Sequence, residues 1–165
     1  MTYIDDIVAF TATAEPSADG ADWTAVRSAV DAATTENTDV GDAETAYAVG
    51  CAVAERVAAV LDSASAARGW SRRSVAGAIG AGAAVGRLLR FDDTRLRHLL
   101  GLCATQATGL RSLDDTEAGE LQVAKAASDA VEAALLVSHG FTSSADGLSG
   151  RRGLFALMAP GSASW

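Results

Sequence analysis

Three carboxylate side chains gather in the second half of the chain, at Asp114, Asp115 and Glu117. Carboxyl groups grouped in this way can take and return protons, which makes them candidates for general acid–base catalysis on a small substrate. The same run of polar residues is also typical of a solvated surface loop. Both interpretations stay open at the level of the sequence, and this set is the candidate catalytic group.

The remaining reactive residues are scattered. His98 lies on the expected exposed side of a helix, and His139 precedes Gly140, where a role at a helix C-terminus explains it. Arg72 and Arg73 can bind an anion at a helix start or simply lie at the surface. Lys125, the single lysine, is expected to have a structural or solvent-facing role.

The two cysteines, Cys51 and Cys103, both fall in apolar helical segments. Free cysteine packs as a small hydrophobic residue, so two buried, reduced thiols are expected. Their spacing fits no metal-binding motif, and the chain has only two histidines, so no metal site is expected.

The composition predicts an all-α fold with a single core. Hydrophobic residues make up 49% of the 165 residues but aromatic residues only 5%, which favours closely packed helices over a sheet. A short helix before Pro16 and a second helix capped by Asp22 are predicted, with a loop at 34–42. Further helices are predicted at 43–67, 73–89, from Asp92 to Gly109, at 121–138 and at 154–158.

Glycines recur on adjacent turns of the fourth predicted helix, between residues 77 and 86. Glycine inside a helix costs about 1 kcal/mol relative to alanine. Such a run therefore indicates a compensating close approach between this helix and its neighbours in the core.

The charge balance excludes several partners. The formal net charge is −8, which repels nucleic acid phosphates and anionic lipid surfaces. The most apolar run, residues 75–85, is too short to span a bilayer, and the N-terminal residues lack the features of a signal peptide. We expect a cytoplasmic protein with no nucleic acid or membrane partner.

Four short stretches carry a pattern that is specific only when they are taken together. They are Tyr-Ala-Val-Gly-Cys-Ala-Val-Ala-Glu-Arg-Val at 47–57, Gly-Trp-Ser at 69–71 with the glycine- and alanine-rich run at 77–89, Gly-Leu-Cys-Ala-Thr-Gln-Ala-Thr-Gly-Leu at 101–110, and the alanine pairs and Gly-Phe-Thr between 126 and 155. In this order they resemble the helical domain of the MmgE/PrpD family, which includes 2-methylcitrate dehydratases and aconitate decarboxylase-like proteins.

The resemblance implies lyase or isomerase chemistry on small di- and tricarboxylic acids, without an obligatory cofactor. The functional residues of that chemistry are missing here. Ser71 stands where the family has the histidine of Gly-Phe-His, and Gly119 and Gln122 stand where it has a lysine and a histidine. Residues 35–46 contain no histidine to supply a further family element. The sequence therefore predicts that the ancestral activity is lost.

Under this interpretation, residues 1–165 form one helical domain, with divergent helices at 1–42, the family-like region at 43–158 and a tail at 159–165. The chain ends where the family's second, α+β domain would begin. We expect an oligomerising or accessory subunit that pairs with itself or with a larger family member, with residues 154–158 and Trp165 as candidate interface. The alternatives are a repurposed lyase, isomerase or cyclase, and binding of a small molecule without turnover. Any surviving pocket is expected to be bordered by Tyr47, Trp70, Ser71 and Gln122.

Overall fold

The computed structural model describes residues 3–13, 23–37, 39–61 and 68–160. These residues form an all-α fold, which confirms the fold class predicted from composition. The helices are α1 (Tyr3–Thr13), α2 (Thr24–Glu36), α3 (Ala43–Leu61), α4 (Arg72–Leu88), α5 (Asp93–Gln106), the short 3-10 helix η2 (Arg111–Leu113), α6 (Glu117–Ser138) and α7 (Leu154–Met158). The described ranges contain no strand, only one isolated antiparallel bridge between Trp70 and Leu110.

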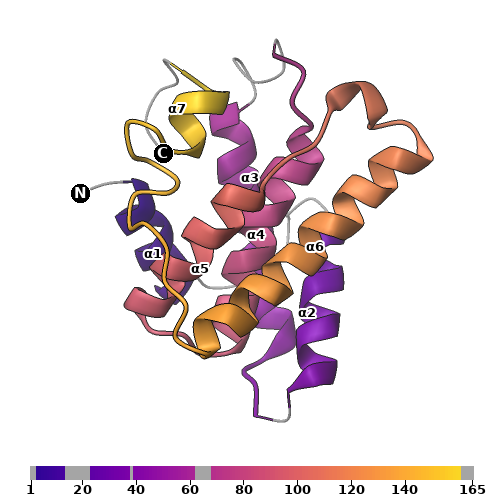
Figure 1. The fold of residues 1–165 in the computed structure, drawn as a ribbon. Coiled ribbons are helices and arrows are strands. Elements are labelled where there is room, and N and C mark those ends of the chain that lie inside the picture. Colours follow the sequence, from indigo (N-terminus) through magenta and orange to yellow (C-terminus); the bar gives the residue numbers. More distant parts are fainter. Residues whose placement is uncertain (1–2, 14–22, 38, 62–67, 161–165) are drawn as a thin grey trace.

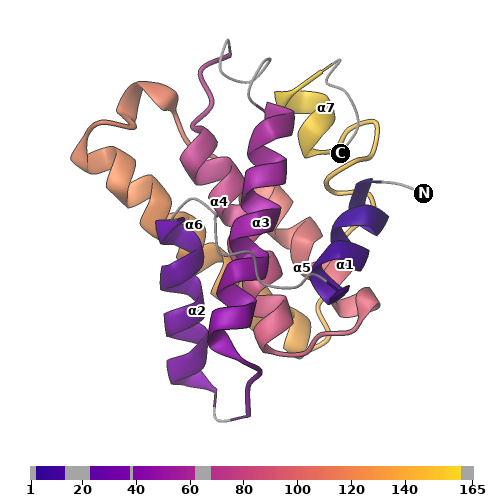
Figure 2. The ribbon, with the colours of Figure 1, turned by 180° about the vertical axis from the view of Figure 1, so that it is seen from behind.

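Helix α4 is the centre of the bundle. It packs against α2, α3, α5 and α6, and the ribbon views show it enclosed by them (Figures 1 and 2). Every residue from 74 to 86 is buried. A helix enclosed on all sides must be apolar around its whole circumference, and the alanine- and glycine-rich sequence of α4 meets that requirement.

The glycines of α4 allow the close helix contacts that the sequence predicts. A Cβ atom on Gly80 would lie 2.6 Å from the Ala54 Cβ atom of α3, and one on Gly50 would lie 2.7 Å from the Gly80 carbonyl oxygen. On the side that faces α5, a Cβ atom on Gly82 would lie 2.6 Å from the Cys103 sulfur. The backbones of α3 and α4 therefore approach closely, and this contact supplies the gain that offsets glycine's cost.

The start of α5 agrees with the sequence and that of α4 agrees to within one residue, whereas that of α6 does not. Asp92 caps α5 as predicted, since its carboxylate accepts from the Arg95 backbone N–H at 2.8 Å. Helix α6 begins at Glu117 instead of residue 121, because the Thr116 hydroxyl caps it and draws the acidic residues into its first turn. Helix α4 begins at Arg72, capped by Ser71. At α2, Trp23 holds the N-cap position without a side-chain hydrogen bond, and Asp22 lies outside the described residues.

One other boundary differs from the prediction, and the predicted end of the third helix lies outside the described residues. Helix α2 continues to Glu36, so the loop predicted from residue 34 is shorter; the hydroxyls of Thr34 and Thr35 donate to carbonyls one turn back and remain compatible with the helix. Helix α3 is described as far as Leu61, and residues 62–67 of the predicted third helix lie outside the described residues.

The two cysteines are buried and form no disulfide, as predicted. Burial raises the pKa of the Cys103 thiol to about 12, with a smaller contribution from the negative charge of Asp129. In the described ranges, no helix combines the length and the hydropathy that a bilayer crossing needs.

Candidate functional site

The candidate site forms where the segment before α4 meets the segment after α5. The Ser71 backbone N–H donates to the Gly109 carbonyl at 3.0 Å, and the Arg111 N–H donates to the Gly69 carbonyl at 2.8 Å. Gly109 has a φ of 140°, and a Cβ atom there would lie 2.8 Å from the Cβ atom of Ser74. Glycine at 109 therefore permits both the backbone conformation and the close contact. We call residues 69–74, 108–114 and 119–122 the polar corner.

Ser71 is the most buried polar residue of this corner, with 0% of its surface exposed. Its hydroxyl donates to the Asp114 carboxylate at 2.6 Å and accepts from the Ser74 backbone N–H at 3.3 Å. One side chain thus caps α4 and joins it to the loop before α6. The hydroxyl proton is committed to a protein carboxylate, not directed at a cavity.

Gln122 holds the same loop from the side of α6. Its amide oxygen accepts from the Leu110 N–H at 2.6 Å, and its amide nitrogen donates to the Leu110 carbonyl at 3.3 Å. The Ser74 hydroxyl adds a contact with the Thr108 carbonyl oxygen at 2.5 Å. Both hydrogen-bonding groups of the Gln122 side chain bond to the backbone of Leu110. This side chain therefore holds the loop at Leu110 against α6.

Gly119 marks the tightest point of the corner. A Cβ atom there would lie 2.3 Å from the Leu113 carbonyl oxygen and 2.7 Å from the Asp114 carbonyl oxygen. Both neighbours are backbone atoms, which cannot move aside as a flexible side chain could. A lysine at this position, which the family resemblance would require, is incompatible with this path of the chain.

The three predicted carboxylates do not converge. Asp114 bonds to Ser71, and its backbone carbonyl accepts from Arg73 at 3.2 Å. Asp115 is exposed, and Glu117 is exposed in the first turn of α6, not on a loop. Arg73 also pairs with Glu120 at 3.1 Å, which gives it a structural contact and not only solvent.

Tyr47 lies away from the other three residues expected at one pocket. The guanidinium carbon of Arg27 lies 3.5 Å from the centre of the Tyr47 ring, and Arg27 pairs with Glu44 at 2.9 Å. The hydrogen bond with Glu44 raises the pKa of Arg27. Gly50, one turn further along α3, packs on Ala84 in the C-terminal half of α4, whereas Ser71 caps the N-terminus of that helix. Trp70, Ser71 and Gln122 meet at the corner; Tyr47 does not.

The remaining titratable residues have structural partners. His98, expected to be exposed, is half-buried because its Nδ1 atom lies 3.2 Å from both the backbone N and O of Ser143. His139 occupies the C-cap position of α6, as predicted. Lys125 forms an ion pair with Asp129, a carboxylate that is only 3% exposed. Sequence reasoning missed Asp129, although its spacing of four residues from Lys125 is the expected signal.

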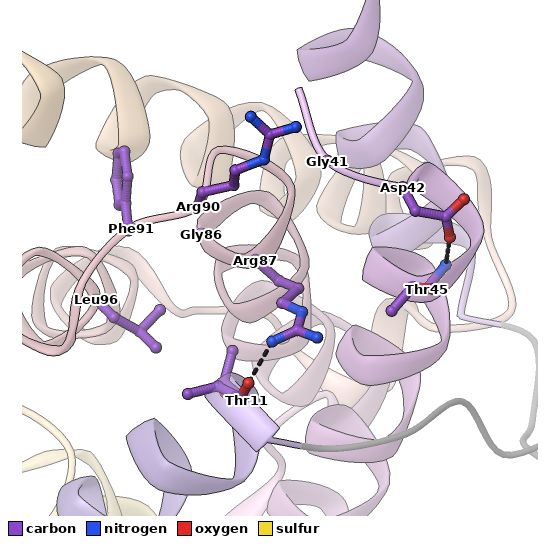
Figure 3. A pocket seen from close by; sticks show the side chains of 10 residues that line it. Thr11, Gly41, Asp42, Thr45, Gly86, Arg87, Arg90, Phe91 and Leu96 are labelled. Carbon is purple, nitrogen blue, oxygen red and sulfur yellow. Dashed lines mark hydrogen bonds between the residues drawn. The ribbon is translucent and has the colours of Figure 1, made fainter. Parts of the chain in front are cut away.

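A cavity of about 510 Å³ lies at the far end of α4 and was not predicted (Figure 3). Arg87 and Arg90 line it, but both hold neighbouring backbone. Arg87 donates to the Ala12 carbonyl near the end of α1. Arg90 donates to the Val40 carbonyl at 2.9 Å and to the Asp39 carboxylate at 3.0 Å. Asp42 accepts from Thr45 at 2.6 Å, and this hydrogen bonding lowers the pKa of Asp42. Each of these groups is thus bonded to another part of the protein.

A second cavity, of about 520 Å³, opens beside Trp70. We call it the Trp70 cavity. It lies between α5 and the segment that leads into α7, and Ser71 and Gln122 do not line it. No group of three metal-ligating side chains occurs in the part of the chain that the structure describes.

The fold and the polar corner define a small helical bundle built around one buried, glycine-rich helix. Comparison with family models identifies it further: the model of the MmgE/PrpD N-terminal domain matches residues 9–164. The chain belongs to the MmgE/PrpD family, which confirms the resemblance found in its sequence. Comparison with curated proteins gives no match.

Proposed function

We propose that this chain is an MmgE/PrpD helical domain that no longer performs the ancestral dehydratase or decarboxylase reaction and instead acts as an accessory, small-molecule-binding subunit. The observation that carries this proposal is the polar corner. The three positions at which the resemblance implies two imidazoles and an ammonium hold Ser71, Gln122 and Gly119, and all three have structural contacts.

Elimination from a hydroxy acid, or loss of carboxylate, needs a base, an acid and cations that hold the substrate's carboxylates. A serine hydroxyl does not exchange protons near neutral pH as an imidazole does, and an amide does not titrate. Gly119 offers no side chain at all. The residues of the corner thus stabilise the fold and do not supply groups for proton transfer.

The rival function is a new lyase, isomerase or cyclase reaction at a repurposed site. Among the described residues that line the Trp70 cavity there is no carboxyl, imidazole or thiol group. The predicted carboxylates Asp115 and Glu117 are not part of its lining. This favours binding without turnover over acid–base catalysis.

We further propose that the subunit works in the cytoplasm and associates with a second copy or with a larger family member. Among the described residues, large apolar side chains are exposed at five positions: Leu110, Leu121, Leu135, Phe141 and Leu157. The predicted interface at 154–158 is narrower than expected, because Leu154, Phe155 and Met158 pack into the core. Trp165 lies outside the described residues. Light scattering tests this association, and a strictly monomeric protein that captures no family member would remove it.

The activity test is direct. Purified protein incubated with 2-methylcitrate or cis-aconitate is expected to give no dehydrated or decarboxylated product by mass spectrometry. Asp114→Asn serves as the matched variant. Product formed by the wild-type chain and lost in Asp114→Asn would show that the corner is catalytic, and the proposal would fail.

A further inference from the structure

The Trp70 cavity combines an apolar interior with a small polar mouth. Its lining includes Leu102 and Ala104 of α5 and Leu154 and Met158 of α7, and all four are buried. Both ribbon views place α7 above α5 (Figures 1 and 2). A volume of about 520 Å³ is in the range of small-molecule sites. The interior suits the apolar body of a ligand.

Hydroxyl groups surround the mouth of the cavity, and two of them are already used. The Ser143 hydroxyl donates to the His98 carbonyl at 2.9 Å, and the Ser144 hydroxyl accepts from the Asp146 N–H at 3.2 Å. The hydroxyls of Thr105 and Thr142 make no hydrogen bond within the described ranges. These two groups can therefore bond to a ligand.

Arg152 is the one charged side chain among the described lining residues. The lining therefore carries a single positive charge and no negative charge. A guanidinium presents paired donors that match a planar carboxylate, and such charge-assisted pairs are stronger than neutral hydrogen bonds. A monoanion balances this charge, whereas a second carboxylate would have to enter the apolar interior without a partner.

We propose that the Trp70 cavity binds an amphipathic monocarboxylate, with the carboxylate at Arg152 and the apolar chain between α5 and α7. This inference rests on the proposed function, since it names the ligand class of the accessory subunit. The ligand class differs from the small, polar di- and tricarboxylates that the family resemblance implies.

Isothermal titration calorimetry with octanoate tests the proposal on the full chain. Octanamide, which keeps the apolar chain but lacks the charge, is expected to bind about tenfold more weakly, and succinate is expected not to bind. Amide chemical shifts measured by NMR with octanoate should change at Thr105, Thr142 and Leu157.

Two matched variants separate this site from general surface attraction. Arg152→Gln is expected to weaken octanoate binding about tenfold, whereas Arg151→Gln, at an exposed neighbour outside the lining, is expected to leave it unchanged. Leu157 lines the cavity yet is 64% exposed, so its substitution should preserve folding. Leu157→Glu is expected to abolish binding, and Leu157→Lys to retain it.

Equal binding of octanoate and octanamide, or equal effects of the Arg151 and Arg152 variants, would overturn the proposed ligand class. So would binding of succinate in preference to octanoate. These results are independent of the activity test. Turnover of 2-methylcitrate or cis-aconitate would refute the proposed function, whereas a chain with no turnover and no octanoate binding would refute this inference alone.

Discussion

Trp70 and Ser71 are neighbours in the polar corner, yet their side chains have surroundings of opposite character. Ser71 turns into the polar corner, where its hydroxyl is fully buried and bonded to Asp114. Trp70 lines a cavity whose mouth keeps unused hydroxyl groups. The polar side chains Ser71 and Gln122 of the corner are hydrogen-bonded to other protein groups. The hydroxyls of Thr105 and Thr142 in the cavity lining make no hydrogen bond within the described ranges. The proposed ligand site therefore lies on the Trp70 side of this segment.

The contrast has an energetic reason. A buried polar group that loses its partner costs about 1–3 kcal/mol, so a corner of buried polar groups is stable only if these groups satisfy one another. Ser71, Asp114 and Gln122 meet this condition with short hydrogen bonds. Polar groups at the rim of a solvent-filled cavity carry no such penalty, because water can satisfy them.

The largest effect is expected at Gly119. Gly119→Ala places a Cβ atom 2.3 Å from the Leu113 carbonyl oxygen, so the chain must shift at the corner. We expect a loss of about 3 kcal/mol in the free energy of unfolding, measured by urea denaturation. Gly119→Lys, which restores the residue implied by the family resemblance, should be at least as destabilising.

Ala118→Lys is the control, since Ala118 is exposed in the same turn of α6. It should change the free energy of unfolding by less than about 0.5 kcal/mol. A Gly119→Lys protein as stable as this control would show that the corner is loosely packed, and the contrast between the two regions would disappear.

A smaller loss is expected at Ser71. Ser71→Ala removes the donor to Asp114 and the cap of α4, and it should lower the free energy of unfolding by about 2 kcal/mol. The exposed Ser112→Ala serves as control and should have almost no effect. A double-mutant cycle with Asp114→Asn isolates the pair. A coupling energy near zero would mean that the corner is not closed by this bond.

The sequence predicted the elements of the fold well because its signals are local. The caps at Asp92 and His139, the short α7 and the glycine-mediated packing of α4 each follow from a few neighbouring residues. The sequence predicts the start of α6 too late, because the Thr116 cap lies inside a run of acidic residues that is typical of a loop. Periodicity of apolar residues cannot detect a polar first turn.

The candidate site was only half predictable. Trp70, Ser71 and Gln122 do meet, but the sequence could not show that Ser71 and Gln122 bond to backbone and to Asp114, since those partners come from distant segments. Tyr47 was placed with them by its position in a family-like helix, and the register of α3 on α4 moves it away. The Trp70 cavity is lined by residues of α5, of the segment 142–152 and of α7, and no local pattern encodes how these segments come together.

The smallest effect concerns Cys103, which tests how far the Trp70 cavity penetrates. Its neighbours Leu102 and Ala104 line the cavity, whereas the Cys103 sulfur packs on Gly82 of α4. Burial raises the pKa of the Cys103 thiol from its ordinary 9.0 to about 12, which lowers the thiolate fraction about a thousandfold at neutral pH. Native protein should therefore resist iodoacetamide at Cys103, as followed by peptide mass spectrometry, and rapid labelling would mean that the cavity reaches α4.

The raised pKa of the Cys103 thiol also predicts how the free energy of unfolding depends on pH. The folded protein binds the Cys103 proton more tightly than the unfolded chain, so the contribution to stability is complete below pH 9.0 and is lost as pH rises toward about 12. At pH 10 the loss should be about 1 kcal/mol relative to pH 8. The Cys103→Ala variant keeps all the other titratable groups. Its free energy of unfolding should therefore lack this pH-dependent loss. Equal pH profiles for the two proteins would place the thiol in contact with solvent, and the wall between cavity and core would then be open.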